Sequence, residues 1–168
     1  HEYRWVLDDE DARLVAENTS EATTYLWRMH MAGQLDLHFR PIRATLGYHL
    51  PCRLRALEVG TPGENLLRLI PGLVVRPIEE GCSGMGGVFG LKREHYRTSL
   101  RMGWGLISRL RDPEIQAGAT ECSACKIQME QGVAKPTLHP IKLLAYAYGL
   151  LPEGETLLHP PGKELQVT

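Results

Sequence analysis

The chain has 168 residues, 43% of them hydrophobic and 23% charged, which is typical of a globular domain large enough to form its own core. Its formal net charge of −1 excludes strong electrostatic attraction to nucleic acid or anionic membranes. No apolar stretch reaches the roughly 18 residues that span a bilayer, and no signal peptide is recognisable. We therefore expect a cytoplasmic protein, and because the chain begins at His1 we expect a fragment of a longer one.

The first predicted element is a helix from Asp8 to about Met31. Its apolar side chains recur every three or four residues, and the acidic run at its start suits the positive end of the helix dipole. Gly33 ends this helix, and Asp36–Pro41 has the composition of a linker. Residues 1–43 are therefore expected to form a helical extension and a linker.

A predicted strand, Thr45–His49, precedes a second helix. Thr61 is the expected N-cap of that helix, and Glu64 completes a capping box with it. The next strand is expected at Leu73–Ile78, where Pro77 indicates an edge position or a strand end because proline cannot donate a hydrogen bond to a neighbouring strand.

A long helix is predicted from Lys92 to about Arg111. Gly103 and Gly105 each cost about 1 kcal/mol inside a helix, so close backbone packing is the expected reason for them. The apolar stripe expected to face the core consists of Tyr96, Leu100, Trp104, Ile107 and Leu110.

The last predicted elements are a strand at 117–120, a helix at about 123–131 and a helix that begins at His139-Pro140. This alternation of strands and helices predicts an α/β fold, with an open, mostly parallel sheet and helices on both faces. We assign residues 44–150 to this domain and residues 151–168 to a loose C-terminal tail.

The four cysteines follow the predicted strands. Cys52 follows the first strand, Cys82 opens a glycine-rich loop after the second, and Cys122 and Cys125 form a C-x-x-C unit after the third. Functional groups gather at the carboxyl ends of parallel strands, so we expect the four thiols to bind one metal ion or iron–sulfur cluster there. A redox-active dithiol and unconnected core thiols are the alternatives. Both zinc and a [4Fe–4S] cluster take four thiolates, so the ligand count does not separate them.

The surroundings of the cysteines bear on this site. Cys122 and Cys125 lie at a predicted helix start, where both thiols are expected to ionise readily. Glycines after Cys82 allow backbone N–H groups to turn toward sulfur, and lysines could offset the charge of four thiolates. For the histidines, a structural role is the alternative. The side chains that could lie beside the ligands are His49, Ser83, Lys92, Lys126 and His139.

Four sequence blocks carry a resemblance to a known family. They are Tyr48–Cys52, Cys82–Gly90, Thr120–Cys125 and His139-Pro140. In this order they resemble the cysteine-rich "CCG" domain that occurs in the iron–sulfur subunit of anaerobic glycerol-3-phosphate dehydrogenase and in FAD-linked oxidase iron–sulfur proteins. That domain is related to one in heterodisulfide reductase. The resemblance covers about residues 44–150.

The resemblance implies a ligand set of Cys52, Cys82, Cys122 and Cys125. The family pattern has a cysteine where this chain has Ser83, so a cubane [4Fe–4S] cluster is favoured over a non-cubane one, with zinc as the alternative. The same resemblance implies no catalytic residue of this chain's own.

The resemblance also implies a function and partners. The implied function is electron transfer in a FAD-linked dehydrogenase system of the glycerol-3-phosphate or hydroxy-acid type. The implied partners are a subunit or domain that holds the FAD, a ferredoxin-like iron–sulfur module and a quinone, and any attachment to the inner face of the membrane would pass through them. A zinc-stabilised docking module without electron transfer and a thiol–disulfide oxidoreductase that uses Cys122 and Cys125 are the alternatives.

Overall fold

The computed structural model describes residues 6, 7 and 9–158. Its centre is a four-stranded sheet in the order β2-β1-β3-β4, and every neighbouring pair of strands is parallel. This confirms the open parallel sheet predicted from the sequence. The strands are β1 (Ala44–Tyr48), β2 (Leu73–Pro77), β3 (Ala117–Ala119) and β4 (Thr137–Leu138).

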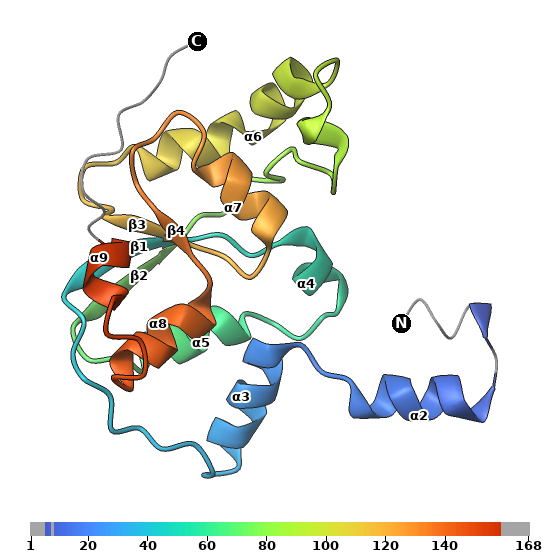
Figure 1. Ribbon diagram of the computed structural model, residues 1–168, viewed down its shortest axis with the longest axis vertical. Coiled ribbons are helices and arrows are strands. Elements are labelled where there is room, and N and C mark those ends of the chain that lie inside the picture. The colour runs from blue at the N-terminus through green and yellow to red at the C-terminus, as the bar shows by residue number, and fades with distance from the viewer. Residues whose placement is uncertain (1–5, 8, 159–168) are drawn as a thin grey trace.

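Helices cover both faces of the sheet, as predicted (Figure 1). One face carries α3 (Ala22–Met31), α5 (Pro62–Arg68) and α8 (Pro140–Ala147), and the other carries α6 (Tyr96–Leu110) and α7 (Ser123–Met129). The short helix α4 (Cys52–Ala56) follows β1 directly, and α2 (Glu10–Asn18) extends away from the sheet (Figure 1).

Two hydrophobic clusters hold these layers together. On the α5/α8 side, Leu46 and Tyr48 of β1 pack with leucines of both helices. On the other side, Gly47 lets the opposite cluster approach closely, because a Cβ there would lie 2.8 Å from Ile78 Cδ1. Residues of β1 therefore alternate between the two cores, as expected for a strand that is buried on both faces.

The connections of the sheet create a crevice at its carboxyl edge. The chain crosses from β1 to β2 on one side and then returns to place β3 on the other side of β1. The strand order thus reverses between β1 and β3, and such a switch point is where open α/β sheets bind ligands.

The N-terminal region departs from the prediction of one helix over residues 8–31. Instead α2 and α3 are separate, and each has its own N-cap. Asp9 accepts a hydrogen bond from the Ala12 N–H (2.7 Å), and Glu21 accepts one from the Thr24 N–H (2.8 Å). The second acidic cap stabilises a new helix start, which the apolar spacing alone did not reveal. Asp8, the predicted first residue, lies outside the described residues.

The predicted core face of α6 is wrong. Tyr96 and Trp104 are 44% and 52% exposed, and Trp104 lies under the Arg111 guanidinium, 4.8 Å from its ring centroid. The helix begins at Tyr96 rather than Lys92 and follows a short 3₁₀ helix, η1 (Phe89–Leu91). The buried face consists of Ser99, Gly103, Leu106, Ile107 and Leu110.

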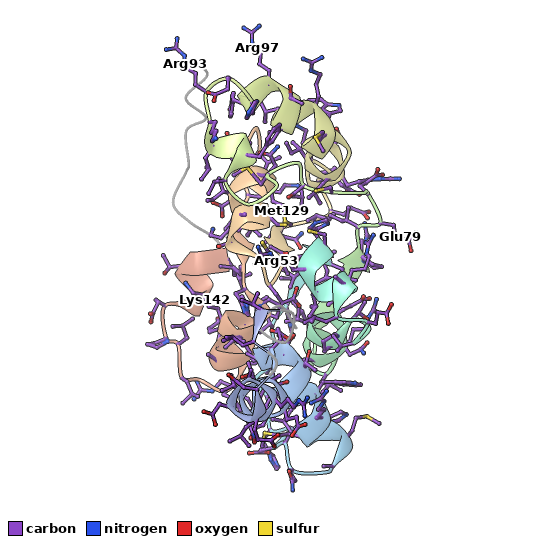
Figure 2. The ribbon with its side chains drawn as sticks, turned by 90° about the vertical axis from the view of Figure 1, so that its right-hand side faces the viewer. Arg53, Glu79, Arg93, Arg97, Met129 and Lys142 are labelled. Carbon is purple, nitrogen blue, oxygen red and sulfur yellow. The ribbon has the colours of Figure 1, made fainter. Side chains whose placement is uncertain are left out.

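The small residues on that face explain its choice. A Cβ on Gly103 would lie 2.3 Å from the backbone oxygen of Ser83, so the helix packs directly against the loop that carries Cys82. Close packing was the predicted reason for this glycine, and it is confirmed. Arg93 and Arg97 project outward from the same end of the molecule (Figure 2).

Two further predictions are corrected. Thr61 makes no side-chain cap bond, and Glu64 instead pairs with Arg68 at 2.7 Å. The predicted loose tail from Pro152 contains a short helix, α9 (Gly154–Leu158), whose Leu158 is buried in the α5/α8 core. Residues 159–168 lie outside the described residues.

Candidate metal centre

The structure places the cysteines after three strands of the sheet. Cys52 is the first residue of α4, directly after β1 and Pro51. Cys122 is the N-cap of α7 and Cys125 lies in its first turn, directly after β3. Cys82 lies in the loop after β2. Because the strands are parallel, these positions share the carboxyl edge of the sheet, as the sequence predicts for the thiols.

The loop after β2 is joined to α7 by a hydrogen bond between serine and cysteine. The Ser83 hydroxyl donates to Cys125 Sγ at 3.2 Å, and both residues are buried. In the same loop the Gly84 N–H donates to Cys82 Sγ at 3.3 Å. Gly84 has a φ of +86°, and a Cβ there would lie 2.3 Å from Ser99 O. Glycine therefore permits both the turn and the contact with α6.

The thiol of Cys125 is held in its neutral form. Burial raises the pKa of Cys125 to about 12, and repulsion from Cys122 and Cys52 adds to this, while the hydrogen bond from Ser83 opposes it. The prediction that Cys125 ionises readily at the helix start is therefore wrong, because burial outweighs the helix dipole. A thiolate at Cys125 needs a compensating positive charge, which a metal would supply.

The thiols do not form a ready-made coordination sphere. Among the described residues, no group of three or more His, Cys, Asp or Glu side chains is placed to hold a metal ion. Cys52 and Cys82 are exposed, Cys122 is partly exposed and Cys125 is buried. The electrostatic coupling of Cys125 to Cys122 and Cys52, and its bond to Ser83, nevertheless bring all three strand ends toward one point.

The two histidines near this edge differ. His139 is the N-cap of α8, and its Nδ1 accepts a hydrogen bond from the Ile141 N–H at 3.1 Å, which is a structural role. His49 is 1% exposed, and neither of its ring nitrogens has a hydrogen-bond partner among the described residues. Burial lowers the pKa of His49 to about 4, and the positive charge of Arg55 contributes.

The two lysines lie at the periphery. Lys126 of α7 forms an ion pair with Glu130 one turn further along the helix, so its charge is already partly compensated. Lys92 is exposed in the segment between η1 and α6.

A carboxyl–phenol pair on the α5 side of the same edge did not emerge from the sequence. Tyr48 Oη donates to Glu121 Oε1 at 2.8 Å, while Glu121 Oε2 is buried without a partner among the described residues. Burial raises the pKa of Glu121 to about 7 and also raises that of Tyr48. The available signal was position, since Tyr48 ends β1 and Glu121 directly precedes Cys122.

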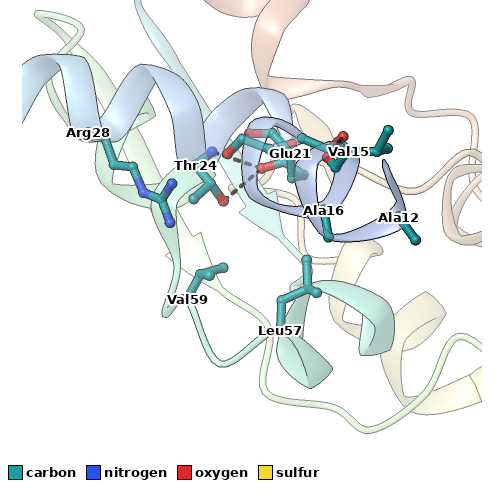
Figure 3. A pocket seen from close by; sticks show the side chains of 10 residues that line it. Ala12, Val15, Ala16, Glu21, Thr24, Arg28, Leu57 and Val59 are labelled. Carbon is teal, nitrogen blue, oxygen red and sulfur yellow. Dashed lines mark hydrogen bonds between the residues drawn. The ribbon is translucent and has the colours of Figure 1, made fainter. Parts of the chain in front are cut away.

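The cavities are separate from the thiols. One of about 400 Å³ opens beside β1 and β2 and is lined by Tyr48, Arg55 and Glu64 among others. Another of about 590 Å³ lies between α2, α3 and the segment that carries Leu57 and Val59 (Figure 3). Neither is lined by a cysteine, so the candidate centre is confined to the strand ends.

An open parallel sheet with cysteines at its carboxyl edge defines a class of α/β cysteine-rich domains. The sequence profile of the CCG cysteine-rich domain family matches residues 46–130, a span that includes all four cysteines. The chain belongs to this family.

Curated relatives extend the match along the chain. The sequence is 33% identical over 146 residues to proteins named as the C-type subunit of anaerobic glycerol-3-phosphate dehydrogenase, from Escherichia coli K12 and from Escherichia coli O157:H7. The alignment covers 87% of this chain and 36% of each relative, so the chain spans about a third of their length. No solved structure matches significantly. Within the part of the chain that the structure describes, no helix is long and apolar enough to cross a membrane.

Proposed function

We propose that this chain is an electron-transfer domain that holds an iron–sulfur cluster through Cys52, Cys82, Cys122 and Cys125. The observation that supports this most strongly is the position of Cys125, which senses the charges of Cys52 and Cys122 and accepts a hydrogen bond from the neighbour of Cys82. Groups that follow three different strands thus converge on one buried sulfur.

The residues present fit such a cluster in kind. Thiolates are soft ligands that suit iron–sulfur clusters and zinc, and the loop glycines free backbone N–H groups to face sulfur. An iron–sulfur cluster would supply a one-electron redox couple at this edge. Since the thiols are not pre-assembled, metal binding would draw them together and would add to the stability of the fold.

The wider role follows from the relatives. Because these are named as subunits of a glycerol-3-phosphate dehydrogenase, we place the domain in a system where a partner subunit or domain holds FAD and oxidises a polyol phosphate or hydroxy acid. Electrons would pass between that partner, a ferredoxin-like module and this domain, with a quinone as acceptor. Any contact with the inner face of the membrane would be made through these partners.

The structure argues against the thiol–disulfide alternative. A dithiol enzyme needs an ionised cysteine, because the thiolate is the nucleophile. Burial raises the pKa of Cys125 to about 12, which leaves this member of the C-x-x-C pair neutral at physiological pH.

The experiment is purification without oxygen, followed by visible absorption, analysis of iron, sulfide and zinc, and EPR of the reduced protein. The proposal predicts a broad absorption in the visible region, iron and acid-labile sulfide, and loss of both in Cys52→Ser. Stoichiometric zinc in a redox-silent protein would instead favour a docking module. A metal-free protein whose disulfide exchange survives Cys52→Ser would favour the dithiol enzyme.

A further inference from the structure

His49 is a deeply buried imidazole whose hydrogen-bonding groups are unused. Only 1% of the residue is exposed, and neither Nδ1 nor Nε2 has a partner among the described residues. Buried polar groups in folded proteins almost always have a partner, since burial without one is costly. His49 therefore marks a place where another group is expected to bind.

Thr120 presents a second unused polar group beside it. This residue is 2% exposed, and its Oγ1 lacks a partner among the described residues. In the register of the sheet Tyr48 pairs with Ala119, so His49 and Thr120 occupy the next position on β1 and β3. The His49 N–H donates to Ala119 O at 2.9 Å, which continues the ladder to this point.

Both side chains belong to the face of the sheet that α7 covers. Two positions earlier on each strand are Gly47 and Gly118, where an added Cβ would meet Ile78 and Met129 of the α6/α7 core. Because side chains alternate along a strand, His49 and Thr120 share that face. The helix above them, α7, carries Cys125 in its first turn, with Cys122 as its N-cap.

We propose that His49 and Thr120 form a hydrogen-bonding seat beneath the first turn of α7, in which the imidazole N–H of His49 donates to a cysteine sulfur of the metal centre. The inference rests on the proposed metal site and adds a positioning residue to it. Thr120 can donate its hydroxyl proton to the other ring nitrogen and so hold the ring in one tautomer. A donor to a metal-bound sulfur spreads the charge of the thiolate and orients the ligand.

The neutral state of the ring agrees with this arrangement. Burial lowers the pKa of His49 to about 4, and Arg55 of α4 adds a positive charge nearby. A neutral imidazole has one N–H donor and one acceptor, which matches one sulfur and one hydroxyl. His139 provides a contrast, because its Nδ1 already accepts the N–H of Ile141 as the cap of α8.

The test uses Zn²⁺ as a redox-silent probe on the full chain with ¹⁵N-labelled histidine. Zn²⁺ affinity is measured by chelator competition for the wild type, His49→Leu, His49→Gln and the control His139→Asn, and histidine ring resonances are recorded without and with Zn²⁺. We expect the His49 resonances to shift on Zn²⁺ binding and to keep one N–H, while those of His139 stay in place. We expect Zn²⁺ affinity to fall about tenfold or more in both His49 variants, as for other groups that support metal ligands.

Each outcome decides one claim. If wild-type protein binds Zn²⁺ no better than Cys52→Ser, the metal site itself fails. If the thiols bind Zn²⁺ but the His49 resonances do not move, or if a ring nitrogen bonds directly to Zn²⁺, the hydrogen-bond role of His49 is overturned while the metal site stands. The wild-type resonances give this answer even if a His49 variant does not fold.

Discussion

The hydroxyl of Ser83 lies 3.2 Å from the sulfur of Cys125 and donates a hydrogen bond to it, although 42 positions separate the two residues in the chain. Both side chains are buried. This bond joins the cysteine-bearing loop after β2 to the first turn of α7, and it brings the loop of Cys82 to the C-x-x-C pair. It favours the charged form of Cys125 against the effect of burial.

Replacing Ser83 with alanine removes this bond. Because the bond lowers the pKa of Cys125, its loss should raise that pKa further and reduce the thiolate fraction. We expect alkylation of Cys125 in metal-free Ser83→Ala protein to be about tenfold slower at fixed pH, the effect of one hydrogen bond to a charged group. The rate is followed for each cysteine by mass spectrometry. Ser123→Ala, which removes an exposed hydroxyl nearby, is the matched control and should leave the rate unchanged. Equal rates in the two variants would contradict the role of Ser83.

The two glycines of α6 should respond in opposite directions to alanine. At Gly103 a Cβ would lie 2.3 Å from the backbone oxygen of Ser83, which cannot move without the loop, so Gly103→Ala should lower the free energy of unfolding by about 2 kcal/mol. At Gly105 the nearest atom is a carboxylate oxygen of Glu80, a flexible side chain, so Gly105→Ala should raise it by up to about 1 kcal/mol. Urea unfolding of both variants measures these changes, and a Gly103→Ala protein as stable as the wild type would refute the packing of α6 on the loop.

Glu121 should make stability depend on pH. Burial raises the pKa of its carboxyl to about 7, well above its ordinary value of 4.5. The folded state then binds more protons than the unfolded state between these values, so this residue's contribution to the free energy of unfolding falls as pH rises from about 4.5 to 7. The difference in unfolding free energy between Glu121→Gln and wild type should therefore grow in favour of the variant across that window.

Urea unfolding at pH 5 and pH 7.5 measures this difference. Glu17→Gln, a change at an exposed position of α2, serves as the control and should follow the wild type at both pH values. If Glu121→Gln also follows the wild type, the carboxyl of Glu121 is not held neutral by the fold.

The strand ends were accessible from sequence because strong local signals mark them. The β-branched and apolar runs predict β1, β2 and β3, and parallel pairing then places Cys52 and Cys122 at one edge. The short strand β4 and helix α4 were not predicted, because two and five residues are too few for a periodic pattern.

Other features depend on tertiary packing that no local pattern reports. The face of α6 was misassigned because Tyr96 and Trp104 form the more apolar stripe, whereas the observed contact with the Ser83 loop selects the small residues Ser99 and Gly103. The neutral thiol of Cys125 likewise results from burial under neighbours distant in sequence. Sequence supplied the ligand types, and the structure supplied their environment.

The central claim is that sulfurs that follow three strands meet around one inorganic centre. X-ray absorption at the metal edge of protein purified without oxygen measures the atoms bound to that metal. The account predicts a first shell made of sulfur, with distances of about 2.3 Å, and the loss of this shell in Cys125→Ser. A first shell of nitrogen and oxygen, or a sulfur shell that persists in Cys125→Ser, would contradict it.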